Sequence, residues 1–224
     1  SMIRARRSTC RNTIAPAEKL FYVGGYGHGF MLEWDPSEEW VNTDKGNPES
    51  NPRFLADAHP DINRPHDLLV HPEGKYVILA GTPGYGYTGG GLMFWDREAE
   101  EAEVITHEQL VQDQSVMSMV ALEGGEILCG TTISAGTGGE VLASLAEMFI
   151  IDPETKLIQW QEPVFEGVRT YSDMILAPNG LVYGITDYIR MFVFDPETRE
   201  VVYEIDLEEE YGATNGQQGP RIFV

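Results

Sequence analysis

The chain contains only two cysteines, Cys10 and Cys129, among its 224 residues. They lie far apart and show no metal-type spacing, and Cys129 falls within the alternating apolar pattern of a strand. We therefore expect Cys129 to be a buried small hydrophobic residue, and we predict no metal site. No run approaches the roughly 20 apolar residues that a membrane-spanning helix needs, so no membrane partner is predicted either.

Positive charge is also scarce, because 36 acidic residues stand against 15 basic ones and leave a formal net charge of -21 at pH 7. Such a field repels phosphate, so nucleic acid is not a predicted partner. The arginine-rich residues 1–17 lack the apolar stretch of a secretory signal. We interpret them as a basic segment that holds a tag remnant, Ser1-Met2, and a partial strand. The cellular compartment stays open.

One turn recurs in the chain, each time directly after a run of alternating apolar residues. Its copies are Asp35-Pro36-Ser37-Glu38, Asp152-Pro153-Glu154-Thr155 and Asp195-Pro196-Glu197-Thr198, with Asp96-Arg97-Glu98 as a fourth copy that lacks the proline. Aspartate caps the first position of such a turn and proline fixes φ at the second. Each copy therefore predicts a strand that reverses into another strand.

A second, glycine-containing turn precedes three of these copies, and together the two turns define a repeated unit of four strands. In the best-defined unit the strands are expected over residues 67–70, 76–79, 92–95 and 103–105. Four antiparallel strands recurring every 40 to 60 residues or so are typical of propeller blades. The sequence thus predicts an all-β propeller with about four blades, near residues 18–45, 64–106, 114–162 and 170–207.

The segment from Asp152 to Trp160, Asp-Pro-Glu-Thr-Lys-Leu-Ile-Gln-Trp, resembles the repeat signature of quinoprotein propellers, and the segment from Asp195 to Tyr203 is a weaker copy. From about residue 18 onward the chain resembles repeat propellers of the quinoprotein-like, YVTN-like and WD40-like class. This resemblance implies an architecture, not an activity. The vicinal cysteine pair of quinoprotein dehydrogenases is missing, so no quinone cofactor, and no other cofactor, is inferred.

The two ends of the chain allow two arrangements, because residues 219–224 resemble the start of a further strand. In one, this strand pairs with residues 20–23 and closes a four-bladed ring. In the other, the first blade has its own inner strand within residues 10–14, and the chain is a fragment or half of a larger ring. A truncated propeller would expose two sheet edges, through which two copies would pair as a homodimer.

Functional residues are expected in the glycine-rich loops and in the segments that enter each blade, which a propeller places on one face. None of these loops is followed by a lysine and a helix, so a phosphate cradle is not predicted. The expected ligand-binding residues are Tyr26, Arg64, Tyr87, Thr131, Arg169, Tyr171, Gln218 and Arg221. Arginines bind carboxylates and tyrosines stack on sugar rings, so the predicted ligand is a polar molecule, foremost a carbohydrate such as a uronate.

Three further residues are catalytic candidates, namely His28, His66 and Tyr85. If they meet beside Arg64, they would suit proton abstraction next to a uronate carboxylate, as in a polysaccharide lyase acting by β-elimination. His71, next to a proline in a turn, is expected to face solvent. Catalysis is not established by these residues, and two alternatives stay open. In the first, the arginines and tyrosines serve only to join blades; in the second, the same face binds a protein partner, as WD-type propellers do.

Overall fold

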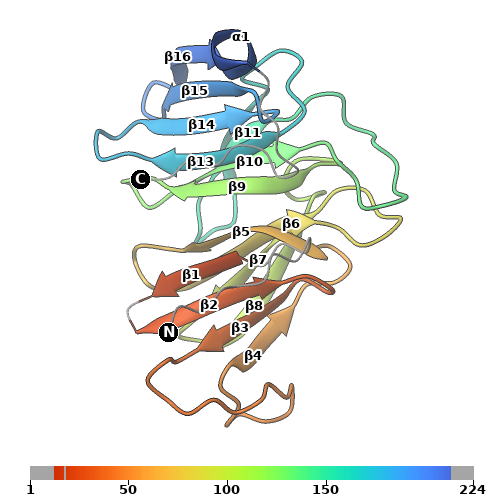
Figure 1. Ribbon diagram of the computed structural model, residues 1–224, viewed down its shortest axis with the longest axis vertical. Helices are drawn as coiled ribbons and strands as arrows, with labels where there is room; N and C mark the ends of the chain where they lie inside the picture. Colours follow the sequence, from red (N-terminus) through yellow and green to blue (C-terminus); the bar gives the residue numbers. More distant parts are fainter. Residues whose placement is uncertain (1–12, 18, 213–224) are drawn as a thin grey trace.

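The computed structural model describes residues 13–17 and 19–212, which form four antiparallel sheets and one short helix (Figure 1). The fold is therefore the all-β, four-bladed arrangement that the sequence predicts. The expected strand at residues 219–224, with Gln218 and Arg221, lies outside the described residues.

Each sheet consists of four strands that are consecutive in the chain, and we call the sheets blades 1 to 4. Blade 1 contains β1 (Thr13–Ala17), β2 (Leu20–Gly25), β3 (Phe30–Trp34) and β4 (Arg53–Asp57). Blade 2 contains β5 (Arg64–Val70), β6 (Tyr76–Thr82), β7 (Gly91–Asp96) and β8 (Glu101–Thr106). Blade 3 contains β9 (Ser115–Ala121), β10 (Ile127–Thr132), β11 (Met148–Ile151) and β12 (Ile158–Glu162). Blade 4 contains β13 (Tyr171–Leu176), β14 (Val182–Thr186), β15 (Arg190–Asp195) and β16 (Glu200–Asp206), followed by α1 (Leu207–Tyr211).

Three of the four repeated aspartate turns reverse one strand into the next, as predicted. In blade 3 the Asp152 carboxylate accepts hydrogen bonds from the backbone N–H groups of Glu154 and Thr155, at 2.9 and 2.7 Å. Asp96 and Asp195 accept the same pair of bonds in blades 2 and 4. The bonds favour the ionised carboxylate, and they lower the pKa of Asp152 and of Asp96 below the ordinary value.

Blade 1 extends beyond the predicted residues 18–45 at both ends. Its inner strand is β1, which pairs with β2 along its whole length, and its outer strand β4 begins only after a loop over residues 35–52. The turn at Asp35 thus opens a loop in place of a tight reversal. Because β1 and β3 occupy both edges of β2, this strand has no free edge at which the ring could close. The closed four-bladed ring suggested by the sequence is therefore wrong.

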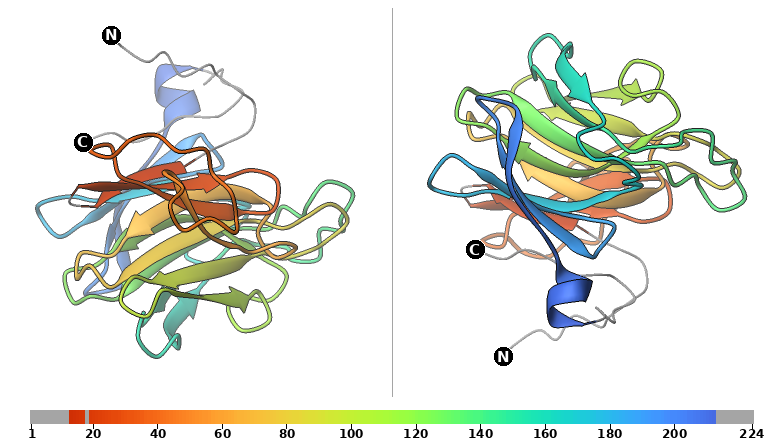
Figure 2. Two further views of the ribbon diagram at one scale, coloured as in Figure 1. Left: turned by 90° about the horizontal axis from the view of Figure 1, so that it is seen from below. Right: turned by 90° about the horizontal axis from the view of Figure 1, so that it is seen from above.

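The blades are stacked in chain order, with blade 1 and blade 4 at opposite ends of the molecule (Figure 1). Figure 1 shows the four strands of blade 1 and those of blade 4 side by side, and the two views in Figure 2 look at these sheets from their outer strands. The end blades accordingly present sheet faces, not the free sheet edges that the sequence predicts. The reason is geometric, since propeller blades pack face to face and each edge is an inner or outer strand.

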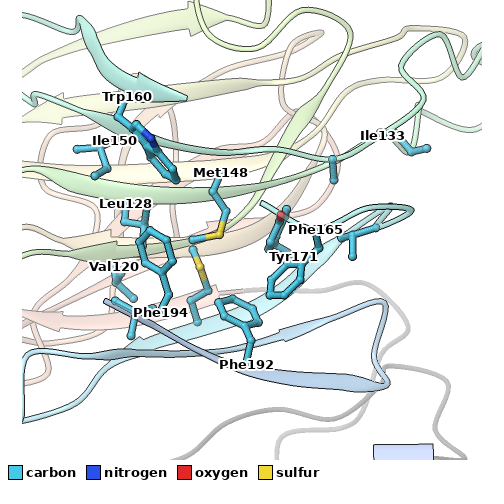
Figure 3. Packing of buried hydrophobic residues seen from close by; sticks show 14 residues of the cluster. Val120, Leu128, Ile133, Met148, Ile150, Trp160, Phe165, Tyr171, Phe192 and Phe194 are labelled. Carbon is cyan, nitrogen blue, oxygen red and sulfur yellow. The ribbon is translucent and has the colours of Figure 1, made fainter. Parts of the chain in front are cut away.

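Three hydrophobic clusters lie between successive blades and join them. Between blades 3 and 4, the signature tryptophan Trp160 packs on Phe194, with 5.6 Å between ring centroids (Figure 3). Cys129 is fully buried between blades 2 and 3, which confirms its predicted role as a small hydrophobic residue. The exposed position predicted for His71 is wrong, because this side chain is buried and hydrogen-bonds the carbonyl oxygen of Gly125 in blade 3 at 2.7 Å.

A polar bridge also connects blades 1 and 2 around the fully buried Tyr22. The phenol donates to the Glu33 carboxylate at 2.7 Å and accepts from the Arg97 side chain at 3.0 Å. Burial and the bond to Glu33 raise the pKa of Tyr22 to about 12 from its ordinary value of 10.0.

Because the folded state holds the Tyr22 proton more tightly than the unfolded chain, this group contributes stability that is complete below pH 10 and is lost as the pH rises toward 12. We expect the urea midpoint to fall across that interval. In Tyr22→Phe the fall should be smaller, although the variant is less stable at pH 8 because two hydrogen bonds are lost. Equal slopes for both proteins between pH 10 and 12 would contradict this role.

Candidate functional site

The loops on one face of the blades are joined by the segments that connect one blade to the next. Before blade 2, the Asn63 carbonyl accepts from the Gly27 N–H of blade 1 at 3.1 Å, and the Asn63 N–H donates to the Thr82 carbonyl at 2.8 Å. Before blade 3, the Gln114 carbonyl accepts from the Gly90 N–H of blade 2 at 3.0 Å. Each connection therefore ties the preceding blade to the following one at this face.

Two long loops from blades 2 and 3 pair with each other beside these connections, and we call residues 83–90 and 133–147 the loop pair. They run together away from the sheets, on the right in Figure 1. The Gly86 N–H donates to the Thr137 carbonyl and the Gly136 N–H donates to the Tyr87 carbonyl, both at 3.0 Å. The Thr88 hydroxyl adds a bond to the Glu140 carbonyl at 2.6 Å. Backbone bonds thus hold both loops in one conformation.

Four side chains meet at the base of the loop pair, and we call Tyr26, Arg64, Tyr85 and Thr137 the arginine–tyrosine cluster. The Arg64 guanidinium carbon lies 5.8 Å from the ring centroid of Tyr26 and 5.5 Å from that of Tyr85. Arg64 also donates to the Thr137 hydroxyl at 2.7 Å, and the two phenol oxygens are 2.5 Å apart. Three blades contribute to this cluster, which brings together three of the residues named from the sequence.

The cluster carries positive charge on an acidic protein. The hydrogen bond with Tyr85, followed by partial burial, raises the pKa of Tyr26 above its ordinary value, so this phenol stays neutral at physiological pH. Arg64 remains cationic at every physiological pH. A guanidinium held between neutral phenols can bind a carboxylate, while the rings offer flat apolar surface.

Apolar side chains are exposed along the same loop pair. Tyr85 and Tyr87 are 59% and 51% exposed, and Val141 and Leu142 are 51% and 59% exposed. Val141 directly follows Glu140, whose carbonyl is bound by Thr88 of the facing loop. Aromatic and aliphatic side chains are therefore exposed on the same pair of loops.

Other predicted ligand residues serve the interior of the fold. Tyr171 is fully buried, and its ring packs against Phe165 and Phe192 (Figure 3). Thr131 is also buried, and its hydroxyl donates to the Gln114 side chain at 2.5 Å. These two side chains are therefore not on the surface where a ligand was expected. Tyr171 belongs to the cluster between blades 3 and 4, whereas Thr131 is bonded to the segment that precedes its own blade.

The other candidates among the described residues make contacts of their own. Arg169 is exposed, and its backbone N–H donates to the Asp187 carboxylate at 3.1 Å. The His28 ring lies edge-on to the His59 ring, with 4.7 Å between centroids. His66 occupies a bulge in β5 and hydrogen-bonds the Thr82 hydroxyl at 3.1 Å.

Asp67 joins blades 2 and 3, because its carboxylate accepts a hydrogen bond from the backbone N–H of Met119 at 2.6 Å.

Sequence reasoning missed three residues of this surface, Thr137, Val141 and Leu142. Thr137 lies within the glycine-rich run after β10. That run predicts a functional loop, but it does not indicate which of its residues takes part. The hydrogen bond from Arg64 to Thr137 spans 73 residues of sequence. Only the pairing of the two loops brings these side chains together.

Within residues 13–17 and 19–212, no three histidine, cysteine or acidic side chains are grouped so that they could hold a metal ion. In the same part of the chain, no helix has the length and apolar character needed to cross a membrane.

No protein-family model matches the sequence, and a search of curated proteins finds no match. Solved structures do match the fold. The WD40 domain of Neurospora crassa Pan2 is 17% identical with a TM-score of 0.57, and the match covers 87% of this chain and 49% of that one. The WD40 β-propeller domain of Doa1 is 12% identical with a TM-score of 0.57, covering 87% and 52%. The chain thus spans about half the length of these structures. Its four blades have the architecture of a WD40-like repeat β-propeller.

Proposed function

We propose that this chain is a propeller scaffold that binds a protein partner through the arginine–tyrosine cluster and the loop pair. The observation that carries the proposal is the exposure of Tyr85, Tyr87, Val141 and Leu142 on backbone-paired loops, with the Arg64 cation over the Tyr85 ring. Tyrosine and arginine are the residue types that most often dominate the binding energy of protein interfaces. The WD40-like architecture is consistent with such a role.

The chemistry of the surface indicates what the partner segment offers. Arg64 would donate hydrogen bonds to an aspartate or glutamate carboxylate of the partner. The exposed rings and aliphatic groups would pack against apolar residues next to that carboxylate. Because the loops are already bonded to each other, little conformational entropy would be lost on binding. We therefore expect an extended acidic segment with aromatic or aliphatic neighbours. Carbohydrate binding and lyase activity, which the sequence suggested, gain no support from the comparisons.

Selection of random peptides displayed on phage against the wild-type protein tests this proposal. We expect enriched peptides to combine an acidic residue with apolar ones. Their affinity should fall at least tenfold, about 1.4 kcal/mol, in Arg64→Ala and again in Tyr85→Ala, because each removes a central contact. Fluorescence anisotropy with a labelled selected peptide measures the dissociation constants.

Tyr203→Ala is the matched control, since Tyr203 is a tyrosine of similar exposure, 52%, on the outer strand β16. Peptide affinity should be unchanged in this variant. Failure to enrich any peptide, or equal losses in Tyr203→Ala, would refute the proposal. Binding of uronate oligosaccharides that disappears in Arg64→Ala, without peptide binding, would replace it with the carbohydrate hypothesis.

A further inference from the structure

In blades 2 to 4, four residues at equivalent positions of each sheet face the preceding blade. We call these four positions the leading face of a blade. They are two pairs of facing residues on the second and third strands. The pairs are Val77 with Trp95 and Leu79 with Met93 in blade 2, Ile127 with Ile151 and Cys129 with Phe149 in blade 3, and Val182 with Phe194 and Gly184 with Phe192 in blade 4. None of these side chains is more than 6% exposed, because each set is covered by the blade before it.

Blade 1 carries the same leading face without a described blade in front of it. Phe21 pairs with Trp34 and Val23 pairs with Leu32, in the register found in the other three blades. All four are apolar, and all four are partly exposed. Trp40, which is 61% exposed, lies against Trp34 with 6.4 Å between ring centroids. The first sheet thus carries a blade-packing surface that no described blade covers.

The complementary set of positions occurs in blade 4, at the opposite end of the stack. In blades 1 to 3, the residues that alternate with the leading face pack against the next blade and form a trailing face, exemplified by Leu128 with Ile150 in blade 3. The equivalent pairs in blade 4 are Tyr183 with Val193 and Ile185 with Met191. All four are apolar; Tyr183 and Met191 are partly exposed, and Ile185 and Val193 are buried.

We propose that the leading face of blade 1 binds the trailing face of blade 4 from a second copy of this chain. The contact would continue, between chains, the interface that occurs three times within the chain. Two copies joined head to tail at both ends would close a ring of eight blades, twice the four blades of one copy. This interface lies at the ends of the stack, and its existence does not depend on the proposed function of the loop pair.

Charge sets how this association responds to salt. Each copy carries a formal net charge of -21, so two copies repel each other, while the proposed contact surfaces are apolar. Salt screens the repulsion and leaves apolar burial in place. Association should therefore tighten as sodium chloride is raised from about 50 mM to about 500 mM, a range over which the Debye length falls several-fold.

Sedimentation equilibrium of the full chain tests the proposal. We expect a mass of twice the 25.0 kDa of one chain at micromolar concentration. Leu32→Arg should shift the mass to that of a single chain, because it places a charge in the apolar contact. Leu157→Arg, at a side chain 67% exposed and away from both end faces, should leave the dimer intact. A single-chain mass for the wild-type protein at all concentrations, or a dimer that persists in Leu32→Arg, would overturn the proposal.

Cross-linking decides the case in which Leu32→Arg fails to fold. In a Cys10→Ser background, Leu32→Cys and Tyr183→Cys are prepared as separate proteins and treated with a short bismaleimide. A head-to-tail interface predicts dimers in the mixture of the two and none in either protein alone, because each contact needs one leading and one trailing face. Cross-linking within Leu32→Cys alone, or none in the mixture, would contradict it.

Discussion

Replacement of Asp67 by alanine is expected to lower the free energy of unfolding by about 3 kcal/mol. The side chain lies on β5, the inner strand of blade 2, and accepts the Met119 N–H of β9 in blade 3 at 2.6 Å. Its second oxygen accepts the Leu68 N–H at 2.9 Å. Hydrogen bonds to a charged group contribute about 1.5–3 kcal/mol, and Met119 is buried, so its N–H would lose a partner that water cannot easily replace.

Urea denaturation followed by circular dichroism measures this loss. Asp67→Asn should cost less than Asp67→Ala, because the amide oxygen still accepts one of the two bonds. Glu103→Ala is the control, since Glu103 is an exposed acid on the outer strand of the same blade and should change stability by less than about 0.5 kcal/mol. Equal stability of Asp67→Ala and Glu103→Ala would show that the bond between blades 2 and 3 contributes nothing.

Gly136→Ala is expected to separate the loop pair and to abolish binding at the arginine–tyrosine cluster. A methyl group at this position would lie 1.9 Å from the backbone carbonyl oxygen of Gly84, which neither backbone can accommodate without moving. The hydrogen bond from the Gly136 N–H to the Tyr87 carbonyl would then be lost. Because the sheets do not depend on this contact, the unfolding midpoint should change little.

Hydrogen exchange detects the change directly, since amides of residues 83–90 should exchange at least tenfold faster in Gly136→Ala. Peptide affinity should fall by a similar factor or more. Gly46→Ala is the matched control, because its nearest neighbour would be 4.0 Å from the added methyl group. Unchanged exchange in the loop of blade 2 would mean that the two loops do not hold each other, and unchanged peptide affinity would place the binding surface elsewhere.

The repeated turns made most of the architecture predictable, because their hydrogen bonds are local. Asp152 binds N–H groups two and three residues away, so the sequence contains the whole interaction. The start of blade 1 was less predictable, since β1 carries no aspartate turn and its place is set by pairing with β2. The long loop after Asp35 shows that the same turn can open a loop when the next strand is distant.

The residue types at the site could be predicted from the sequence, but not which individual residues lie there. Tyr85 and Tyr171 both lie in or next to loops of the predicted functional face; the first was predicted as a catalytic residue and the second as a ligand-binding residue. One is 59% exposed and the other is fully buried. The difference depends on which blade packs over each ring, here Phe165 and Phe192 over Tyr171, and that is not encoded in either local segment.

The sequence by itself determined that this protein is a row of four-stranded units, because alternation and turn chemistry act over a few residues. Only the tertiary structure decided how the units meet. Stacking of blades brought Arg64 to Thr137 across 73 residues, covered three leading faces, and left the face with Phe21 and Trp34 partly exposed. The physical reason is that burial depends on the neighbouring sheet, and each sheet packs on side chains contributed by a different part of the chain.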